Sequence, residues 1–416
     1  MNVIIVGAGI GGLTLALTLH RAGIPCRVYE SAPEIKDIGV GINLLPHATK
    51  ELAELGLEDA LARVAVTTRE AVFFNRFGQL IYSEPLGRYA GYPWPQFSIH
   101  RGELQAVLVD ACKSRIGANR IVTGWRCARA DQDRDGVTAH FNDPGTHQEL
   151  EPQRGSVVIG CDGINSALRK QLYPAEGDPI YSGVNMWRGV TRWQPFLSGA
   201  TFVRAGWHAT GKAVIYPSRN NIDPQGRQLV NWVAEIETPH HKLRDWNRPG
   251  DLNDFIARFE DWCFDWLDVP AFFSKADTIL EFPMVDQDPL PQWSFGRMTL
   301  LGDAAHPMYP RGSNGAGQAI LDAGALGDNL AKYSDPVEAL KAYESQRLDA
   351  TASIVRMNRK NPPDAILREV YLRTGDRPFK NIDEVITRDE LAALSDGYKR
   401  VAGHERESRG SARGGG

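Results

Sequence analysis

The chain has 416 residues, 42% of them hydrophobic, and 47 basic against 51 acidic side chains give a formal net charge of −4. These values are ordinary for a globular protein of two to three domains and exclude bulk electrostatic attraction for nucleic acid or an anionic membrane. Five scattered cysteines, none in a C-x-x-C pair, argue against a disulfide scaffold or a metal site. No basic leader precedes the first strand, and the first apolar stretch is broken by glycines, so we expect a cytoplasmic protein without a membrane span.

The first thirty residues have the pattern of a dinucleotide-binding βαβ unit. The β-branched run 3–6 predicts a buried parallel strand, followed by glycines spaced G-x-G-x-x-G and by a helix that Gly23 ends. A second strand ends at an acid placed to bind a ribose 2′-hydroxyl, which disfavours a 2′-phosphate and predicts FAD or NAD. The expected cofactor-binding residues here are Gly7, Gly9, Gly11, Gly12 and Glu30.

The next segments predict a loop, a hairpin and a helix. The stretch 39–43 is too rich in glycine for the interior of an element and reads as a mobile loop. Runs at 72–74 and 79–82 around Asn75–Gly78 predict a β-hairpin. A helix with one apolar face is expected from His100.

The middle of the chain predicts one more buried strand and then a second type of sheet. The run 156–160 is a buried strand that leads into the sequence CDGINSALR at 161–169. Short apolar runs between turns predict an antiparallel sheet over 183–282. Within it, 246–273 reads as helical, with Phe255, Phe259, Trp262 and Trp266 at helix spacing as core residues.

The stretch 299–322 predicts a ligand site. A short apolar strand ends at Gly302 and Asp303, and two prolines and a glycine-rich turn at 312–317 then lead into a helix. The free N–H groups and the positive dipole end of a helix favour an anionic or electron-rich ligand. A tight connection without a ligand is the alternative. Helices are expected after Asp322, with a break at Pro362 and Pro363.

These motifs resemble the fingerprints of the single-component FAD-dependent aromatic hydroxylases, which share the fold of para-hydroxybenzoate hydroxylase. The segments SIHRGELQ, MWRGVT, NWV, PMVDQDPLP and MYPRGSNGAGQAILD look most like the phenazine-carboxylate, salicylate and 3-hydroxybenzoate hydroxylases. The resemblance implies an α/β fold in which a Rossmann-type FAD-binding domain (1–71, 97–178 and 285–355) is interleaved with a smaller, mainly antiparallel-sheet substrate domain (72–96 and 179–284). A C-terminal helical segment (356–402) and a disordered tail (403–416) follow.

The resemblance also implies roles for individual residues. The Asp of the GDAAHP segment binds the ribityl chain, the following helix start faces the flavin N1/C2=O edge, and the loop at 39–43 lies over the isoalloxazine. The Arg and Gln of HRGELQ reach the ribityl and phosphate groups, with exposed surface side chains as the alternative. The implied cofactor-binding residues are Gly41, Arg101, Gln105, Asp162, Gly163, Gly302, Asp303, Gly312, Asn314, Gly315 and Ala316.

In this family NAD(P)H reduces the flavin, and O2 adds at C4a to give the hydroperoxide that oxygenates an electron-rich ring. Only one complete βαβ unit is present, so FAD is expected as the resident cofactor and NADH or NADPH as a transient reductant. Pro307 and Pro310 suit a dry wall of the site, and His306 is a candidate base or a packed, hydrogen-bonded residue. The candidate substrate residues are Trp187, Arg188, His208 and Tyr216.

The expected partners are a small aromatic substrate and O2, in a monomer or homodimer. Three alternatives remain from the sequence. The first is another flavin oxidoreductase of the same fold: a halogenase, a reductase or a non-hydroxylating oxidase. The second is an NAD dehydrogenase, and the third is an FAD-binding module without activity.

Overall fold

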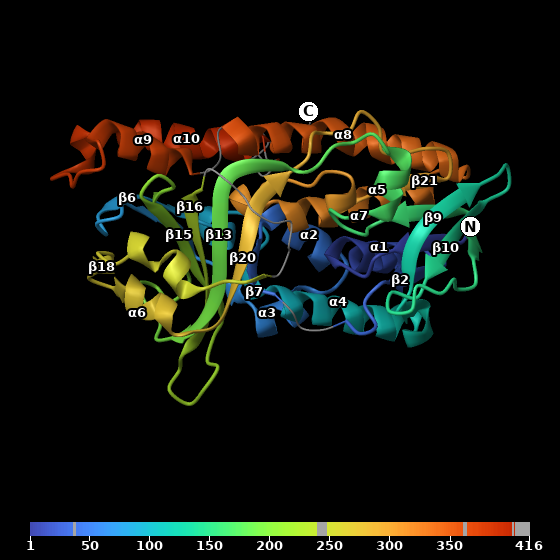
Figure 1. Ribbon diagram of the computed structural model, residues 1–416, viewed down its shortest axis with the longest axis horizontal. Helices are drawn as coiled ribbons and strands as arrows, with labels where there is room; N and C mark the ends of the chain where they lie inside the picture. Colours follow the sequence, from blue (N-terminus) through green and yellow to red (C-terminus); the bar gives the residue numbers. More distant parts are fainter. Residues whose placement is uncertain (36–38, 239–247, 361–363, 402, 404–416) are drawn as a thin grey trace, which may run out of the picture.

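Two large sheets, one parallel and one mainly antiparallel, lie at opposite ends of the molecule in Figure 1, and helices run along one edge past both of them. The structure is a computed structural model that describes residues 1–416 except 36–38, 239–247, 361–363, 402 and 404–416. The predicted disordered tail, 403–416, lies outside the described residues apart from Gly403.

The parallel sheet has the strand order β21-β12-β1-β2-β8. Its strands are β1 (Val3–Val6), β2 (Cys26–Glu30), β8 (Ile121–Thr123), β12 (Val157–Gly160) and β21 (Met298–Leu300). Every residue of β1, β12 and β21 is buried, as the continuous apolar runs predict for strands covered on both faces. Helices α1 (Ile10–Arg21), α4 (Arg101–Ile116) and α7 (Gly315–Lys332) pack together beside this sheet.

The second sheet has eight strands in the order β17-β20-β13-β16-β15-β14-β5-β6. Its neighbours are antiparallel except for the parallel pair β14 and β5. The strands are β5 (Glu70–Phe74), β6 (Leu80–Pro85), β13 (Ile180–Trp193), β14 (Thr201–Trp207), β15 (Gly211–Arg219), β16 (Gln228–Glu237), β17 (Arg248–Pro249) and β20 (Ala276–Asp286). One face of the sheet packs on α6 (Val269–Ser274) and its neighbours, and the other turns toward the cofactor motifs and the C-terminal helices.

Smaller elements connect these sheets. A three-stranded sheet joins β3 (Gly41–Leu44), β7 (Phe97–His100) and β4 (Val66–Thr67), and another joins β11 (Gln153–Gly155), β10 (Val137–Asn142) and β9 (Arg126–Gln132). The remaining α-helices are α2 (Pro46–Glu54), α3 (Glu58–Val64), α5 (Ala167–Leu172), α8 (Pro336–Lys360), α9 (Ala365–Thr374) and α10 (Arg388–Val401). In Figure 1, α8, α9 and α10 lie along the edge that spans both large sheets.

Two predictions of local structure were wrong. Part of the expected loop at 39–43 is strand β3, because it pairs with β7, more than fifty residues away, through Gly41 and His100. The expected helix over 246–273 is, in its described part, a series of short pieces: β17, two 3-10 turns, the β18–β19 hairpin (Cys263–Phe264, Leu267–Asp268) and α6. Its aromatic residues nevertheless belong to the core, as predicted: Phe255, Phe259 and Trp262 are buried and Trp266 packs against them.

Candidate functional site

The first glycine turn lies between β1 and α1. Gly7 has a φ of +105°, a region that side chains other than glycine rarely adopt, and a Cβ at Gly12 would overlap the carbonyl of Gly7. At Gly9, the N-cap of α1, no protein atom lies within 4 Å of an added Cβ, and the helix has no side-chain cap. The turn therefore offers the open, uncapped helix start that a pyrophosphate requires.

Two side chains hold the peptide of Ala8 within this turn. Glu30 Oε2 accepts a hydrogen bond from the Ala8 N–H at 2.8 Å, and Gln105 Nε2 donates to the Ala8 carbonyl at 2.9 Å. The other Glu30 oxygen accepts from the Ala32 N–H at 2.8 Å. The structure thus brings Glu30 and Gln105 to the same turn from β2 and α4. Arg101 lies exposed in the first turn of α4.

The second fingerprint follows β12. Asp162 Oδ2 accepts from the Ala167 N–H at 2.8 Å, while its Oδ1 is buried without a hydrogen-bond partner among the described residues. Burial raises the pKa of Asp162. Gly163 has a φ of +74° and open space where a side chain would be. Asp162 and Gly163 therefore form a turn with a polar atom available to a ligand.

Arg169, at the end of the second fingerprint, ties it to the third. Its guanidinium donates to the carbonyls of Ala304 and Ala305 at 2.9 and 3.0 Å and pairs with Glu176 at 2.6 Å. This buried contact was not predicted from the sequence. The sequence signal that could have indicated it is the arginine at the end of the CDGINSALR segment.

The third fingerprint follows β21. Gly302 turns the chain with a φ of +64°. The Asp303 side chain that follows has surface accessible to solvent. Desolvation by the surrounding protein atoms raises the pKa of Asp303. His306 and Pro307 are buried, whereas Pro310 is exposed. His306 Nε2 lies 2.5 Å from Asp322 Oδ2 of α7, which also accepts from the Gly302 N–H at 3.1 Å. The Asp322 carboxylate therefore contacts both Gly302 and His306, which lie on either side of Asp303 in the sequence.

The helix start predicted to face a ligand begins at Gly315. Gly312 and Ser313 before it are both left-handed, with φ of +74° and +57°, and Asn314 lies at the N-cap position without capping the helix through its side chain. Ala316 follows in the first turn. The first N–H groups of α7 thus have no capping side chain, and the helix dipole favours negative charge there.

A cavity of about 130 Å³ lies between this helix start and the eight-stranded sheet. Arg188 and Tyr216 line it together with Gly41 and the turn 310–316. Arg188 donates to the Gly41 carbonyl at 3.0 Å, and Asn231 Oδ1 accepts from the Gly41 N–H at 2.6 Å. Burial lowers the pKa of Arg188 and raises the pKa of Tyr216 to about 12.

Two of the predicted substrate residues do not line this cavity. Trp187 follows Met186 and precedes Arg188 on β13, and because neighbouring strand residues point to opposite faces, it lies in the core against Phe255 at 5.3 Å between ring centroids. His208 is buried behind Glu235, with 2.7 Å between its Nε2 and the carboxylate. Neither residue lines this cavity, and their contact with substrate stays a prediction.

The cavity wall beside His208 is a buried chain of charges that was not predicted from the sequence. Lys212 Nζ lies 2.9 Å from Glu235 and 2.6 Å from Asp364, and Arg204 Nε lies 3.1 Å from the other oxygen of Asp364. These residues come from β14, β15, β16 and the residue before α9. Burial opposes ionisation of Glu235, but Lys212 and His208 outweigh it and hold its pKa below the usual value.

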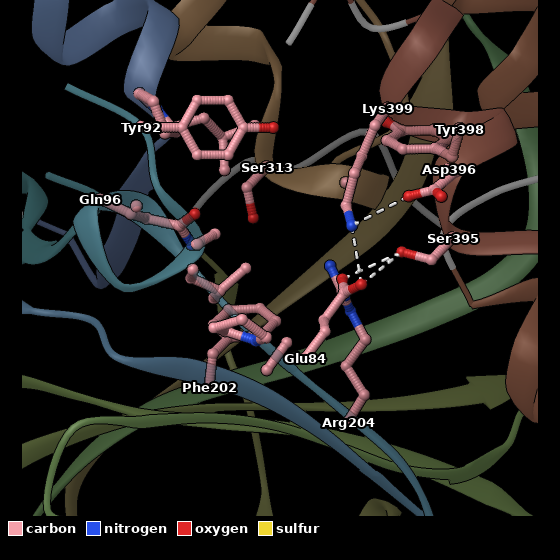
Figure 2. Close-up of a pocket in the computed structure, with 18 of the residues that line it drawn as sticks. Glu84, Tyr92, Gln96, Phe202, Arg204, Ser313, Ser395, Asp396, Tyr398 and Lys399 are labelled. Atoms are coloured by element: carbon pink, nitrogen blue, oxygen red, sulfur yellow. Dashed lines mark hydrogen bonds and ion pairs between the residues drawn. The ribbon is translucent and has the colours of Figure 1, made fainter. Parts of the chain in front are cut away.

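A larger cavity of about 660 Å³ adjoins the first one, and both are lined by Phe202, Arg204, Gly312 and Ser313. Figure 2 shows it between Tyr92 and Gln96 on one side and Tyr398, Lys399 and Ser395 of α10 on the other. On the α10 side, Lys399 Nζ and Ser395 Oγ donate to the Glu84 carboxylate at 2.7 and 2.8 Å. Such a volume is typical of sites for small organic ligands.

The described residues contain no group of three or more His, Cys, Asp or Glu side chains that could hold a metal ion. Their helices include none with the length and apolar composition needed to cross a membrane.

The parallel sheet with its three open turns is the architecture of a protein that binds a dinucleotide cofactor. The chain belongs to the FAD binding domain family, whose model matches residues 1–358. It is similar to the phenazine 1,6-dicarboxylic acid hydroxylase PhzS of Lysobacter antibioticus, with 41% identity over 96% of this chain and 97% of that one. It is also similar to the 6-hydroxynicotinate 3-monooxygenase of Bordetella bronchiseptica, with 30% identity over 91% of this chain and 93% of that one.

Among solved structures, HpxO of Klebsiella pneumoniae, complexed with FAD and uric acid, matches with a TM-score of 0.75 and 26% identity, covering 97% of this chain and 95% of that one. The predicted fold class, the family, FAD with NAD(P)H as cofactors, and the class of aromatic hydroxylase are confirmed.

Proposed function

We propose that the enzyme hydroxylates a planar aromatic acid of more than one ring, bound across the two adjoining cavities. The main support is that the small cavity at the start of α7 shares wall residues with a neighbouring cavity of about 660 Å³. A single-ring acid would leave most of the larger volume to water. The similarity to a phenazine 1,6-dicarboxylic acid hydroxylase supports a substrate of more than one ring.

We assign FAD to the three turns, as the sequence predicts. Gly7, Gly9, Gly11 and Gly12 receive the pyrophosphate at α1, with Asp162 and Gly163 beside it, and Glu30 binds the adenosine ribose. Arg101 and Gln105 contact the ribityl and phosphate groups, Asp303 after Gly302 binds the ribityl chain, and Gly41 and the residues Gly312, Asn314, Gly315 and Ala316 contact the flavin ring. Two features support the fit: the space that glycine leaves at Gly9 and Gly163, and the Oδ1 of Asp162, which has no hydrogen-bond partner among the residues that the structure describes.

Bound FAD, once reduced by NAD(P)H, supplies the O2 activation that places one oxygen atom on the ring. The residues of the chain bind, orient and keep the site dry. The N-terminus of α7 stabilises negative charge at the flavin edge. Pro310 lines the small cavity and carries no N–H that would hold water there, whereas Pro307 is buried and lines neither cavity. Tyr216, with its pKa of about 12, remains a neutral phenol beside the substrate.

Arg204 is the residue we assign to the substrate carboxylate. It lines both cavities, lies over the Phe202 ring at 4.6 Å, and contacts Asp364 through Nε. Figure 2 shows its side chain directed into the larger cavity. The guanidinium of Arg204 can pair with the carboxylate of a planar aromatic acid while the ring of that acid stacks beside the Phe202 ring.

Residues 1–71, 97–178 and 285–355 form the FAD-binding domain, 72–96 and 179–284 the substrate domain, and 356–402 a C-terminal helical segment. The enzyme acts in the cytoplasm, for which five free thiols give support, as a monomer or homodimer.

The test is NADH oxidation by the purified enzyme, with O2 and H2O2 followed together. The compounds are salicylate, 3-hydroxybenzoate, anthranilate and phenazine-1-carboxylate. We expect the tricyclic acid to stimulate oxidation most and to yield least peroxide. Arg204→Met should raise its KM by about tenfold or more, as for a lost charged contact, and leave the response to a neutral phenazine unchanged. Better coupling with a single-ring acid would overturn the substrate class.

A further inference from the structure

The turn that leads into α7 has a backbone conformation that requires external support. Gly312 and Ser313 are consecutive left-handed residues, and Ser313, with a φ of +57°, is one of few residues other than glycine in that region. Such a conformation persists only where the surroundings hold it. The following inference rests on the proposed role of this turn at the flavin edge.

The support comes from the far end of the chain. Tyr398 of α10 is buried, and a Cβ at Gly312 would overlap its hydroxyl. Glycine is therefore required at 312 for two reasons, the positive φ and the close approach of Tyr398. In Figure 2, Tyr398 lies on the α10 side of the larger cavity, and Ser313 points into the same space.

Hydrogen bonds make this contact specific. The Asn314 Nδ2 donates to the Tyr398 hydroxyl at 2.6 Å, and that hydroxyl donates to Asn358 Oδ1 at 2.9 Å. Asn358 in turn donates from Nδ2 to the Tyr309 carbonyl and accepts from Arg311 at its own carbonyl, both at 3.3 Å. Tyr398 and Asn358 thus hold the turn at both of its ends.

The direction of the Asn314 side chain has a chemical consequence. Asparagine at the start of a helix commonly accepts from the first N–H groups through its side chain. Here its carboxamide is turned toward α10 and makes no such cap, and its Oδ1 has no partner among the described residues. The first N–H groups of α7 therefore remain directed at the site instead of at a protein side chain.

We propose that Tyr398 is a positioning residue for the flavin: through Asn314 it fixes the 311–314 turn so that the start of α7 faces the flavin edge. The C-terminal helix is then part of the active site, although it lies more than eighty residues from the fingerprint. Without the hydroxyl, Asn314 loses its anchor, the left-handed turn relaxes, and the helix N–H groups lose their alignment.

The experiment is a double-mutant cycle with Tyr398→Phe and Asn314→Ala, measured on the apoprotein and on the holoenzyme. For the apoprotein the measurement is the dissociation constant of FAD from tryptophan fluorescence quenching. For the holoenzyme it is the midpoint potential of the flavin and the H2O2 formed per NADH with the best substrate. We expect Tyr398→Phe to raise the dissociation constant about five- to tenfold, as for one lost buried hydrogen bond, and to shift the potential to a more negative value.

The cycle separates positioning from general stability. In the Asn314→Ala background, Tyr398→Phe should have a clearly smaller effect on FAD affinity and potential than in the wild type, because the Asn314 contact is already gone and only the contact of the hydroxyl with Asn358 is left to lose. Tyr173→Phe, which removes a hydroxyl donating to the Gln292 carbonyl at 2.8 Å, is the matched control and should leave both values at the wild-type level. The thermal midpoint of the apoprotein shows whether each variant is folded.

Independent, additive effects of the two substitutions would overturn the proposal, and so would wild-type FAD affinity and potential in Tyr398→Phe. Failure of the proposed function is distinguishable by Asp303→Ala. If Asp303→Ala releases FAD while Tyr398→Phe is silent, only the role of Tyr398 fails. If neither variant affects FAD, the assigned cofactor site fails as well.

Discussion

His306 Nε2 lies 2.5 Å from Asp322 Oδ2, and both side chains are buried. The other oxygen of Asp322 accepts from Arg347 Nε at 2.8 Å. Burial alone would raise the pKa of Asp322, but His306 and Arg347 outweigh it and hold that pKa below its usual value. The charged Asp322 carboxylate therefore supports the turn that carries Asp303, and the Nε2 of His306 is occupied by its contact with Asp322.

The first prediction concerns His306 as a candidate base. In His306→Gln, an amide can still donate to Asp322, so we expect hydroxylation to fall by less than about tenfold. Loss of a general base would cost roughly 10²- to 10⁴-fold. The measurement is kcat for coupled hydroxylation at saturating substrate. A drop of a hundredfold or more with FAD still bound would return His306 to a catalytic role.

Asp322→Asn should have a much larger effect on the fold than on the chemistry. Removing the carboxylate charge leaves the largely buried Arg347 guanidinium uncompensated and weakens the contact with His306, at a cost of about 3–5 kcal/mol. We expect a lower thermal midpoint and loss of FAD on desalting. Asp328→Asn is the control on the same helix, because Asp328 is exposed and lies 3.5 Å from Arg21. Equal behaviour of the two variants would contradict the role given to Asp322.

The local fingerprints could be predicted because their signals are local. A buried β-branched strand, a glycine turn and a helix start lie within about ten residues of each other, so Gly7, Asp162 and Asp303 fall at strand ends as expected. The end of β2 likewise places Glu30 beside the first turn, at 2.8 Å from the Ala8 N–H.

The long-range contacts could not be predicted in the same way. Gly41 lies in a strand because β7 and Asn231 are beside it, and neither partner leaves a signal in the 39–43 segment. The face of β13 that carries Arg188 and not Trp187 depends on the register of the whole sheet. Tyr398 is a single tyrosine in an amphipathic helix, with nothing local to connect it to Gly312.

Asp303→Ala should weaken FAD retention. The carboxylate lies at the end of β21 with an accessible surface, and a hydrogen bond to a charged group contributes about 1.5–3 kcal/mol. We therefore expect the dissociation constant of FAD to rise by about 10- to 100-fold, measured by reconstitution of the apoprotein. Asp135→Ala, an exposed turn residue, is the control. A variant that stays yellow after desalting would refute this role of Asp303.

Arg188→Met tests the contact between the eight-stranded sheet and β3, the strand that we propose lies over the flavin. Arg188 donates to the Gly41 carbonyl, so its loss should loosen β3 and raise the H2O2 formed per NADH by several-fold, because water gains access. Arg192→Met, on the same strand but paired with an exposed Asp277 at 3.5 Å, is the control. Unchanged coupling in Arg188→Met would show that Gly41 is held by Asn231 alone.

The last prediction is a dependence of stability on pH from His208. Burial lowers the pKa of His208, the Glu235 hydrogen bond raises it less, and Lys212 lowers it further. The unfolded chain, with a histidine pKa of about 6.5, therefore binds the proton at a higher pH than the folded chain does. Stability is fully present above about pH 6.5 and is lost as the pH falls from there toward the lower folded pKa. The carboxylates of this cluster lose their own contribution to stability only below about pH 4.5, so their pH range is separate from that of His208.

We expect the thermal midpoint to fall between pH 7.5 and 5.5, and His208→Gln to flatten that fall. The exposed His20 provides the control His20→Gln, which should retain the full slope. A slope as steep in His208→Gln as in the wild type would assign the loss to another group.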